Sequence, residues 1–303
     1  MLGASALCLV WIVHRRVLLT DFLTGHGWPA RTVDDLGQGL QTYASDFRPV
    51  ALAPGLVPVL LGVFVGAPLF AGAPLFAGDL ENGTAKLVTA QSVSRTRWLA
   101  VKLGVTGSVI VVATVALSVA FGWWWSPVKG TATVLDWTSG DAFDTTGPVL
   151  VALSLFTFVG GVAIGVALRR TPASMVVTFA FAVAVQLVWS HFRLSLGAPV
   201  TVTTRQGVTA EGSFPVLPDG AYQVGQSYLT GGGDRLGWSA CADSANDQAH
   251  EACLRAADVV GRNVEYLPIS RMSGMQRLGA GILLALTAGL TAFVSVWGRK
   301  RLV

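Results

Sequence analysis

Long apolar runs with few charges alternate with short polar stretches along this 303-residue chain. Five of the runs have about the 20 residues that a helix needs to cross the hydrocarbon core of a bilayer. They lie near residues 50–71, 99–123, 148–168, 173–189 and 278–297. A sixth and weaker run covers residues 2–13, where His14, Arg15 and Arg16 interrupt it. The pattern therefore predicts six membrane-spanning helices.

The first run has a second interpretation as a cleaved signal peptide. Signal peptides carry basic residues before their apolar part, and no basic residue precedes residues 2–13. We therefore expect a first span here, with a true start upstream of Met1 left open. Residues 14–49 would then form the first outer loop.

The composition agrees with a polytopic membrane protein. Hydrophobic residues make up 52% of the chain and charged residues only 13%, with a mean hydropathy of +0.58. Soluble domains carry roughly 25% charged residues, so most of this surface must face lipid. The predicted location is the cell membrane. The basic pI of 9.2 requires no nucleic acid, because cations next to membrane spans are attracted by anionic lipid headgroups.

The charges also predict the orientation. With both termini in the cytoplasm, the cytoplasmic segments contain nine cations against two anions, Asp79 and Glu81. The cations are Lys86, Arg95, Arg97, Lys102, Arg169, Arg170, Arg299, Lys300 and Arg301. Short loops rich in Lys and Arg stay in the cytoplasm, so this orientation is favoured over its inverse. Arg15 and Arg16 are the one local exception.

Residues 190–277 are expected to form a small mixed α/β extracytoplasmic domain between the last two helices. Residues 246–260 have helical periodicity and residues 201–214 have weak strand character. Cys241 and Cys253 suggest a disulfide in this setting, although zinc binding with His250 or free thiols are alternatives. The predicted division is 1–189 for helices 1–5, 190–277 for this domain, and 278–303 for helix 6 and a basic tail.

The sequence contains no motif for catalysis or nucleotide binding. GxxxxGK[ST], GxSxG and HExxH are all absent, so we predict no metal site, no cofactor and no enzymatic activity in this chain. No charge lies in the middle of a confident span, where Gln186 is the most polar residue near one. Ion-driven carriers usually keep an ionisable group there, so an energy source outside this chain is favoured.

The segment GAPLFAGDLENGTAKLVTAQSVSRTRWLAVKLG resembles the signature loop of ABC-2 type transporter permeases of the actinobacterial type. The ending YLPISR, an apolar span and a basic tail are also similar to that family. The residues that occupy the positions of the loop signature are Asp79, Glu81, Gly83, Thr84, Leu87, Ser94, Arg95, Trp98 and Lys102.

The resemblance implies a transport subunit that works with a separate ABC ATP-binding subunit, usually as two permease copies and two ATPases. ATP and Mg²⁺ would then bind in the partner subunit. The loop between helices 2 and 3, residues 72–99, would contain the coupling element that contacts the ATPase, with Arg97 beside the signature residues. The implied activity is export of a hydrophobic or amphipathic compound. The alternative is a non-transporting immunity or sensor protein whose outer domain binds a ligand.

Local chemistry in the loop is compatible with that role. Thr84 and Ser94 can each cap a short helix, and Glu81 beside a helix N-terminus would be favoured by the helix dipole. Arg95 and Arg97 could pair with acidic groups of a partner. The simpler interpretation is that these cations only anchor the loop at the membrane surface.

A repeated hexamer and two glycine pairs carry information about the length and packing of the helices. The hexamer GAPLFA occurs twice, at 66–71 and 72–77, which puts in doubt the register between the second helix and the coupling loop. Two glycine pairs, each spaced four apart, predict close contacts between helices, although lining a substrate path is an alternative. The pairs are Gly62 with Gly66 and Gly161 with Gly165.

Overall fold

A computed structural model describes most of the chain and divides it into two compact units. The described residues are 2–25, 72, 74–75, 77–78, 81–82, 95–129, 136–207, 214–244 and 246–301. The membrane unit comes from residues within 1–196 and 273–303, and the second unit is 197–272. The predicted span at 50–71 and the first copy of the hexamer lie outside the described residues.

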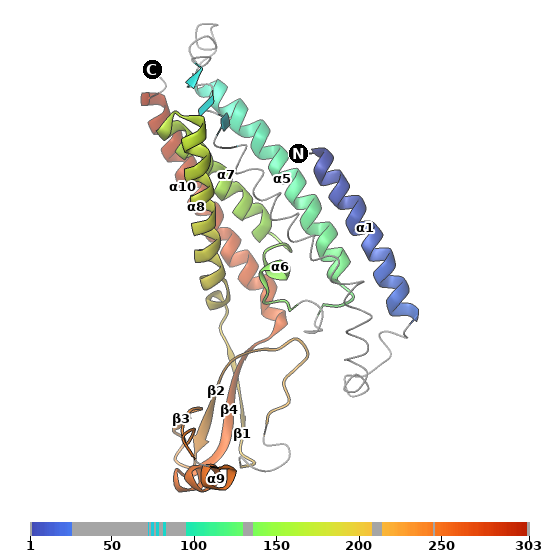
Figure 1. Ribbon diagram of the computed structural model, residues 1–303, viewed down its shortest axis with the longest axis vertical. Coiled ribbons are helices and arrows are strands. Elements are labelled where there is room, and N and C mark those ends of the chain that lie inside the picture. Colours follow the sequence, from blue (N-terminus) through green and yellow to red (C-terminus); the bar gives the residue numbers. More distant parts are fainter. Residues whose placement is uncertain are drawn as a thin grey trace. The chain divides into compact units, whose positions relative to one another are not determined.

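Long helices make up the membrane unit (Figure 1). Among the described residues, four helices are long and apolar enough to cross a membrane, and they confirm four of the predicted spans. These spans are Ala100–Trp125, Val149–Leu168, Thr171–Leu196 and Ile269–Val296. The elements of this unit are α1 (Leu2–Gly25), α5 (Arg95–Trp125), α6 (Gly140–Phe143), α7 (Val149–Leu168), α8 (Thr171–Phe192), η2 (Arg193–Leu196) and α10 (Met272–Arg301).

We name the two ends of this unit by the predicted orientation. The inner end carries the start of α5 and of α8 and the end of α7 and of α10 (Figure 1). The charge pattern predicts that this end faces the cytoplasm. The outer end is the opposite one, where α5 and α8 finish. The count of six spans and the side on which the termini lie remain predictions.

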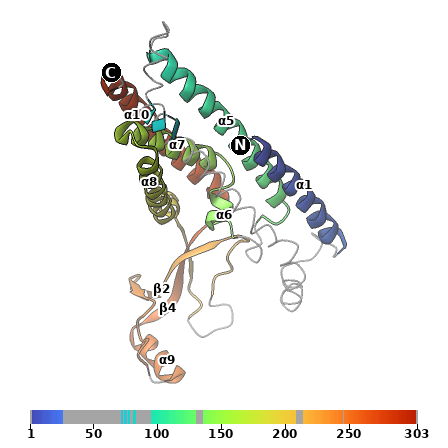
Figure 2. The ribbon, with the colours of Figure 1, turned by 45° about the horizontal axis from the view of Figure 1, so that its top comes forward.

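The N-terminal helix α1 is longer than the sequence suggested. It continues through His14 and both arginines to Gly25, so the expectation that residues 14–25 belong to a loop is wrong. The physical reason is a contact with α5, which lies alongside α1 (Figure 2). Arg16 Nη1 donates hydrogen bonds to the carbonyls of Trp123 and Trp124, at 3.0 and 3.2 Å, at the end of α5. Helix C-termini leave such carbonyls without an intrahelical donor, and a cation suits them.

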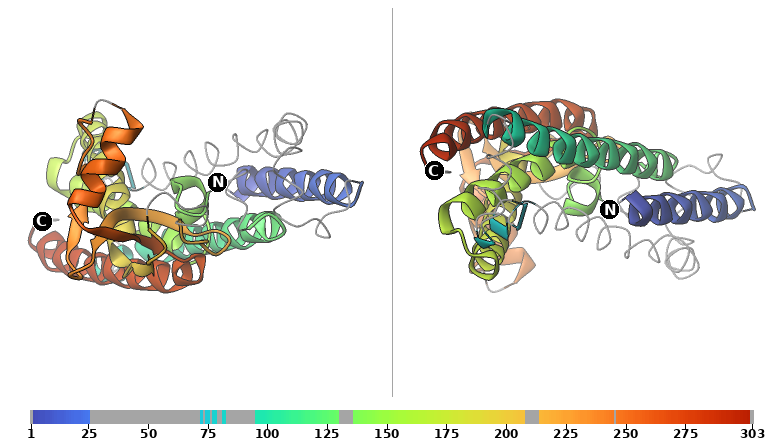
Figure 3. Two further views of the ribbon diagram at one scale, coloured as in Figure 1. Left: turned by 90° about the horizontal axis from the view of Figure 1, so that it is seen from below. Right: turned by 90° about the horizontal axis from the view of Figure 1, so that it is seen from above.

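Helix α7 is the most buried of the four spans. In its apolar window 72% of the residues are buried, against 17% for α8. Phe158 and Val162 of α7 pack with Ile110 of α5 and Val294 of α10 in one apolar cluster. Seen from either end, α1 lies on the side of the unit away from α8 and α10 (Figure 3). The core of the membrane unit is therefore built around α7.

Glycines in α7 allow a close approach of α8. Gly161 and Gly165 are buried, while the other predicted pair, Gly62 and Gly66, lies outside the described residues. The tightest contact is one residue earlier, where a Cβ on Gly160 would lie 2.2 Å from the ring of Phe181 in α8. A packing role for the predicted pairs remains a prediction.

The unit 197–272 contains a four-stranded antiparallel sheet in the order β1-β4-β2-β3. Its elements are β1 (Val200–Thr204), β2 (Tyr222–Thr230), β3 (Arg235–Gly237), α9 (Asp247–Ala256), β4 (Val259–Leu267) and η3 (Ile269–Arg271). The helix predicted for residues 246–260 ends earlier, because the β-branched Val259 and Val260 begin the longest pairing in the sheet. Asn246 caps α9 by accepting a hydrogen bond from the backbone N–H of Ala249 at 2.8 Å.

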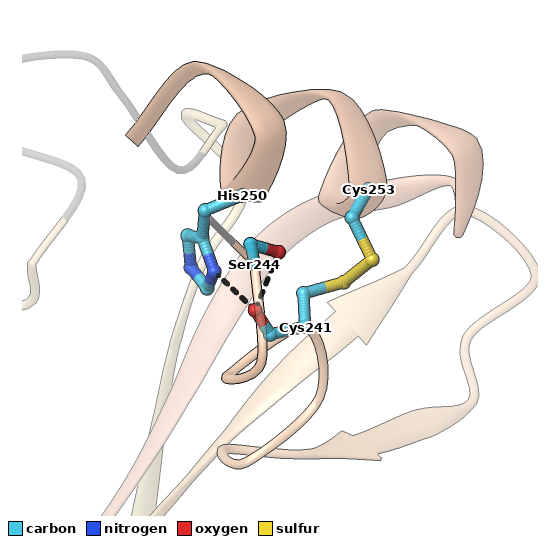
Figure 4. The surroundings of a disulfide bond; sticks show 4 residues. All are labelled: Cys241, Ser244, His250 and Cys253. Atoms are coloured by element: carbon cyan, nitrogen blue, oxygen red, sulfur yellow. Dashed lines mark hydrogen bonds between the residues drawn. A yellow bond between two sulfur atoms is a disulfide. The ribbon is translucent and has the colours of Figure 1, made fainter. Parts of the chain in front are cut away.

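Cys241 and Cys253 form a disulfide that ties a turn to α9, with their Cα atoms 5.9 Å apart (Figure 4). His250 lies beside it, with Nδ1 2.8 Å from the carbonyl oxygen of Cys241. The same oxygen accepts a hydrogen bond from the hydroxyl of Ser244 at 2.7 Å. Within the described residues, no cluster of histidine, cysteine and carboxylate groups could hold a metal ion.

Candidate coupling site and outer junction

The described residues of the second copy of the hexamer, among them Gly72, Leu75 and Ala77, pack within the membrane unit. A Cβ on Gly72 would lie 2.7 Å from the carbonyl oxygen of Phe158 in α7, so only glycine fits there without a shift. Leu75 packs against the apolar cluster of α7, and Ala77 is fully buried. The repeat therefore reaches α7 immediately before the loop begins.

Lys102 and Trp98 attach the start of α5 to this hexamer. The ammonium group of Lys102 lies 3.4 Å from the carbonyl oxygen of Leu75 and 4.8 Å from the centre of the Trp98 ring. Trp98 in turn packs on the apolar cluster. A cation on a backbone carbonyl and an aromatic face stabilises the local fold. These two residues therefore hold the loop to the helices at its far end.

Glu81 connects the loop to α8. Its carboxylate accepts a hydrogen bond from the backbone N–H of Thr171, the first residue of α8, at 2.8 Å. Arg170 occupies the N-cap position without a side-chain cap, so Glu81 supplies the missing acceptor from 90 residues away. Hydrogen bonds from Thr171, followed by the positive charge of Arg170, lower the pKa of Glu81. The carboxylate also suits the positive end of the helix dipole.

The other predicted loop residues are only partly described. Arg95 begins α5 and the side chain of Arg97 is exposed. The remaining predicted loop residues lie outside the described residues: Asp79, Gly83, Thr84, Leu87 and Ser94. Of the described members, Glu81 contacts α8, whereas Trp98 and Lys102 lie in α5, where Trp98 packs on the apolar cluster around α7.

A buried carboxylate, which the sequence reasoning missed, lies at the outer end. Asp144 follows α6 and is only 6% exposed. It accepts hydrogen bonds from Trp189 Nε1 at 2.6 Å and from Gln186 Nε2 at 3.2 Å. Arg193 Nη1 lies 3.2 Å away and completes an ion pair. All three donors belong to the C-terminal part of α8 and the turn that follows it.

The turn between α6 and α7, which carries Asp144, is also held by α10. Gln276 donates hydrogen bonds from Nε2 to the carbonyls of Phe143 and Thr146, each at 2.9 Å. A Cβ on Gly279 of α10 would lie 2.4 Å from the ring of Trp189, so α8 and α10 are in direct contact there. We call this group of side chains the outer junction. It consists of Asp144, Gln186, Trp189, Arg193 and Gln276.

Burial dominates the electrostatics of the outer junction. It raises the pKa of Asp144, and the donors Trp189, Arg193 and Gln186 partly offset that rise. A signal for this site was present in the sequence. Gln186, Trp189 and Arg193 are spaced three and four residues apart, which places polar donors on one face of an apolar helix. Trp189 stands at the end of an apolar run in the sequence, and the structure buries it.

Comparison with known families identifies the membrane unit. A family described as ABC-2 membrane transporter related matches residues 2–193, well over half of the chain. The chain belongs to this family. The match covers the loop, α8 and the first four members of the outer junction, and it ends before the unit 197–272. No curated protein and no solved structure matches the chain.

Membership confirms the resemblance to ABC-2 type permeases, though not its actinobacterial qualifier, and the chain is a membrane component of an ABC-2 type transporter. The four candidate spans agree with a multi-pass membrane location. Members of this family are permeases that generally work with an ATP-binding subunit and are generally not catalytic themselves.

Proposed function

We propose that this chain is the permease subunit of an ATP-driven exporter of hydrophobic or amphipathic compounds. A separate ATP-binding subunit supplies the energy and docks on residues 79–98. ATP and Mg²⁺ bind in that partner, because this sequence lacks a phosphate-binding loop. Two copies of the permease act together with two ATPases.

The observation that carries the proposal is the contact between Glu81 and the N-terminus of α8. A docking loop transmits force only if it is attached to the helices that move. Glu81 reaches α8, while Lys102 and Gly72 attach the ends of the loop to α5 and α7. A partner that pushes on this loop therefore acts on three helices at once.

Exposed apolar side chains on α8 favour a second copy in the complex. Val176 is 70% exposed and Leu187 is 65% exposed. Such a surface can pack against lipid or against a second helix bundle. We assign part of this exposed apolar surface of α8 to contact with the second permease copy, because two ATP-binding subunits require two permeases.

Co-purification tests this function. A tagged full-length chain, extracted from its native membrane in mild detergent, should recover an ABC ATP-binding subunit at a fixed stoichiometry. Glu81→Lys and Arg95→Glu should each lower that recovery by roughly tenfold, the factor for ~1.4 kcal/mol. Asp219→Lys, a charge reversal at an exposed position of the other unit, is the matched control and should change nothing.

The proposal fails if no ATP-binding subunit is recovered, or if both loop variants recover it as well as the control does. The first of these results would favour the sensor or immunity interpretation. If the ATP-binding subunit is recovered, substrate-stimulated ATP hydrolysis in the reconstituted complex identifies the exported compound.

A further inference from the structure

The two ends of α8 are held in different ways. At the inner end, one exposed carboxylate, that of Glu81, accepts a hydrogen bond from Thr171. At the outer end, Asp144 accepts from three side chains and forms an ion pair whose two side chains are 12% and 9% exposed. An exposed contact competes with water and breaks readily, whereas separating a buried pair leaves an uncompensated charge. The outer attachment is therefore much the stronger of the two.

The outer end is also fixed to a second helix. Trp189 donates its hydrogen bond to Asp144 while its ring lies against Gly279 of α10. Gln276 of α10 holds the backbone of the α6–α7 turn, on which Asp144 lies. Movement of the outer end of α8 would disturb all of these contacts together.

Between its ends, α8 buries Ser174 and Thr178 and packs on α7, and most of its other residues are exposed or half-buried. Only 17% of its apolar window is buried. Its close contact with α7 occurs at Gly160, where the absence of a side chain leaves the ring of Phe181 directly against the backbone. The 22 residues of α8 span about 33 Å at 1.5 Å per residue. A small displacement at one end of such a helix becomes a rotation about the other end.

We propose that α8 acts as a lever whose pivot is the outer junction and whose moving end is attached to Glu81. Asp144 is then a positioning residue for transport, because it keeps the outer end of α8 in place while the inner end tilts. This inference rests on the proposed function, since the ATP-binding subunit supplies the displacement of the loop. It assigns a role to a carboxylate that lies far from the docking loop.

Hydrogen exchange in the complete complex tests the lever without knowledge of the substrate. The permease and its ATP-binding subunit are placed in lipid nanodiscs and compared without nucleotide and with ATP plus orthovanadate. Peptides covering residues 171–177 report the inner end of α8, and peptides covering residues 186–193 report the outer end. In the wild-type complex, we expect inner-end exchange to change by roughly fivefold or more, the low end of allosteric effects. Outer-end exchange should stay the same.

Three variants separate the two ends. Glu81→Gln should reduce the nucleotide response of the inner end, because the attachment to α8 is weakened. Asp144→Asn should make the outer end respond to nucleotide, because the pivot is loosened. Asp141→Asn changes an exposed carboxylate of α6 and serves as the control, with the wild-type pattern expected.

The lever is overturned if both ends of α8 respond equally in the wild-type complex, or if Asp144→Asn behaves as Asp141→Asn does. These results differ from a failure of the proposed function. If the proposed function itself is wrong, either no complex forms or nucleotide leaves hydrogen exchange in residues 95–102 unchanged. A response in residues 95–102 without any response in α8 would retain the transporter and reject the lever.

Discussion

The two ends of α8 contrast in what they expose to water and in how they are bound. The inner end follows α7 after two residues, and its contact with the docking loop is one hydrogen bond to the exposed Glu81, 90 residues away in the sequence. The outer end is bound through a buried carboxylate with three donors and through contacts with α10. One helix therefore has an exposed contact that water can replace at one end and a buried network at the other. This contrast explains how a docking loop at one end could act on the whole bundle.

The largest expected effect is at the outer end. Asp144→Ala should lower the free energy of unfolding by about 3–5 kcal/mol, because Arg193 is left buried without its partner. Thermal and denaturant unfolding in detergent would measure it. The double variant Asp144→Ala/Arg193→Met should recover much of this loss, since it removes both charges. A single variant as stable as the wild type would contradict the strong outer attachment.

A smaller effect is expected where the loop meets α7. Gly72→Val should cost about 1–3 kcal/mol, because its Cβ would lie 2.7 Å from the carbonyl oxygen of Phe158. Gly107→Ala on α5 is the matched control, since no atom lies within 4 Å of the added Cβ. Equal stability of the two variants in denaturant unfolding would show that the hexamer does not pack on α7.

Acid should affect the two ends in opposite directions. The pKa of Glu81 is lowered in the fold, so its contribution to stability is present above its usual pKa of 4.5 and is lost as the pH falls through the lowered value. The stability difference between wild type and Glu81→Gln should therefore shrink below about pH 4.5. Unfolding measured from pH 3 to pH 7 would fail to support this contact if the difference stayed constant.

The contribution of Asp144 to stability changes with pH in the opposite direction. Burial raises its pKa above the usual 3.8, so its contribution is fully present below that value and declines as the pH rises through the raised pKa. Relative to Asp144→Asn, the wild type should lose stability as the pH rises through this range. The same set of unfolding curves measures it, and a gain with rising pH would contradict the dominance of burial.

The smallest effect on stability is expected at the inner end. At neutral pH, Glu81→Gln should lower the melting temperature only slightly, and far less than Asp144→Ala, because the site is exposed and glutamine still offers an acceptor oxygen. The rate of ATP hydrolysis by the complex should nevertheless fall by roughly fivefold. If Glu81→Gln instead reduced the amount of folded protein and left the hydrolysis rate per complex unchanged, Glu81 would serve stability and not coupling.

The sequence predicted the parts of the fold that depend on uniform composition. Runs such as 148–168 and 278–297 have no charge and correspond to α7 and α10, with differences only at their ends. The length of α1 was missed because Arg16 looked like the end of a span. Its guanidinium instead binds carbonyls of α5, and nothing in the local sequence indicates such a distant acceptor.

The candidate site was predicted less completely. The loop was identified from its charges and its family signature. The sequence did not reveal that Glu81 caps α8, because Thr171 lies 90 residues further along the chain. Asp144 lies outside the apolar runs and resembles an ordinary loop carboxylate. The periodic donors Gln186, Trp189 and Arg193 were the available signal, and they pointed to a buried acceptor without identifying it.

A double-mutant cycle on ATP hydrolysis tests the lever most directly. Glu81→Gln and Asp144→Asn are measured singly and together in the reconstituted complex, beside a control cycle of Glu81→Gln with Asp141→Asn. Thr171 and Trp189 are about 27 Å apart along α8, and distant independent sites normally have additive effects. The lever predicts that the combined effect departs from the product of the single effects by roughly fivefold or more. The lever would be contradicted if the combined effect lay within about twofold of the product of the single effects, as is expected for the control cycle.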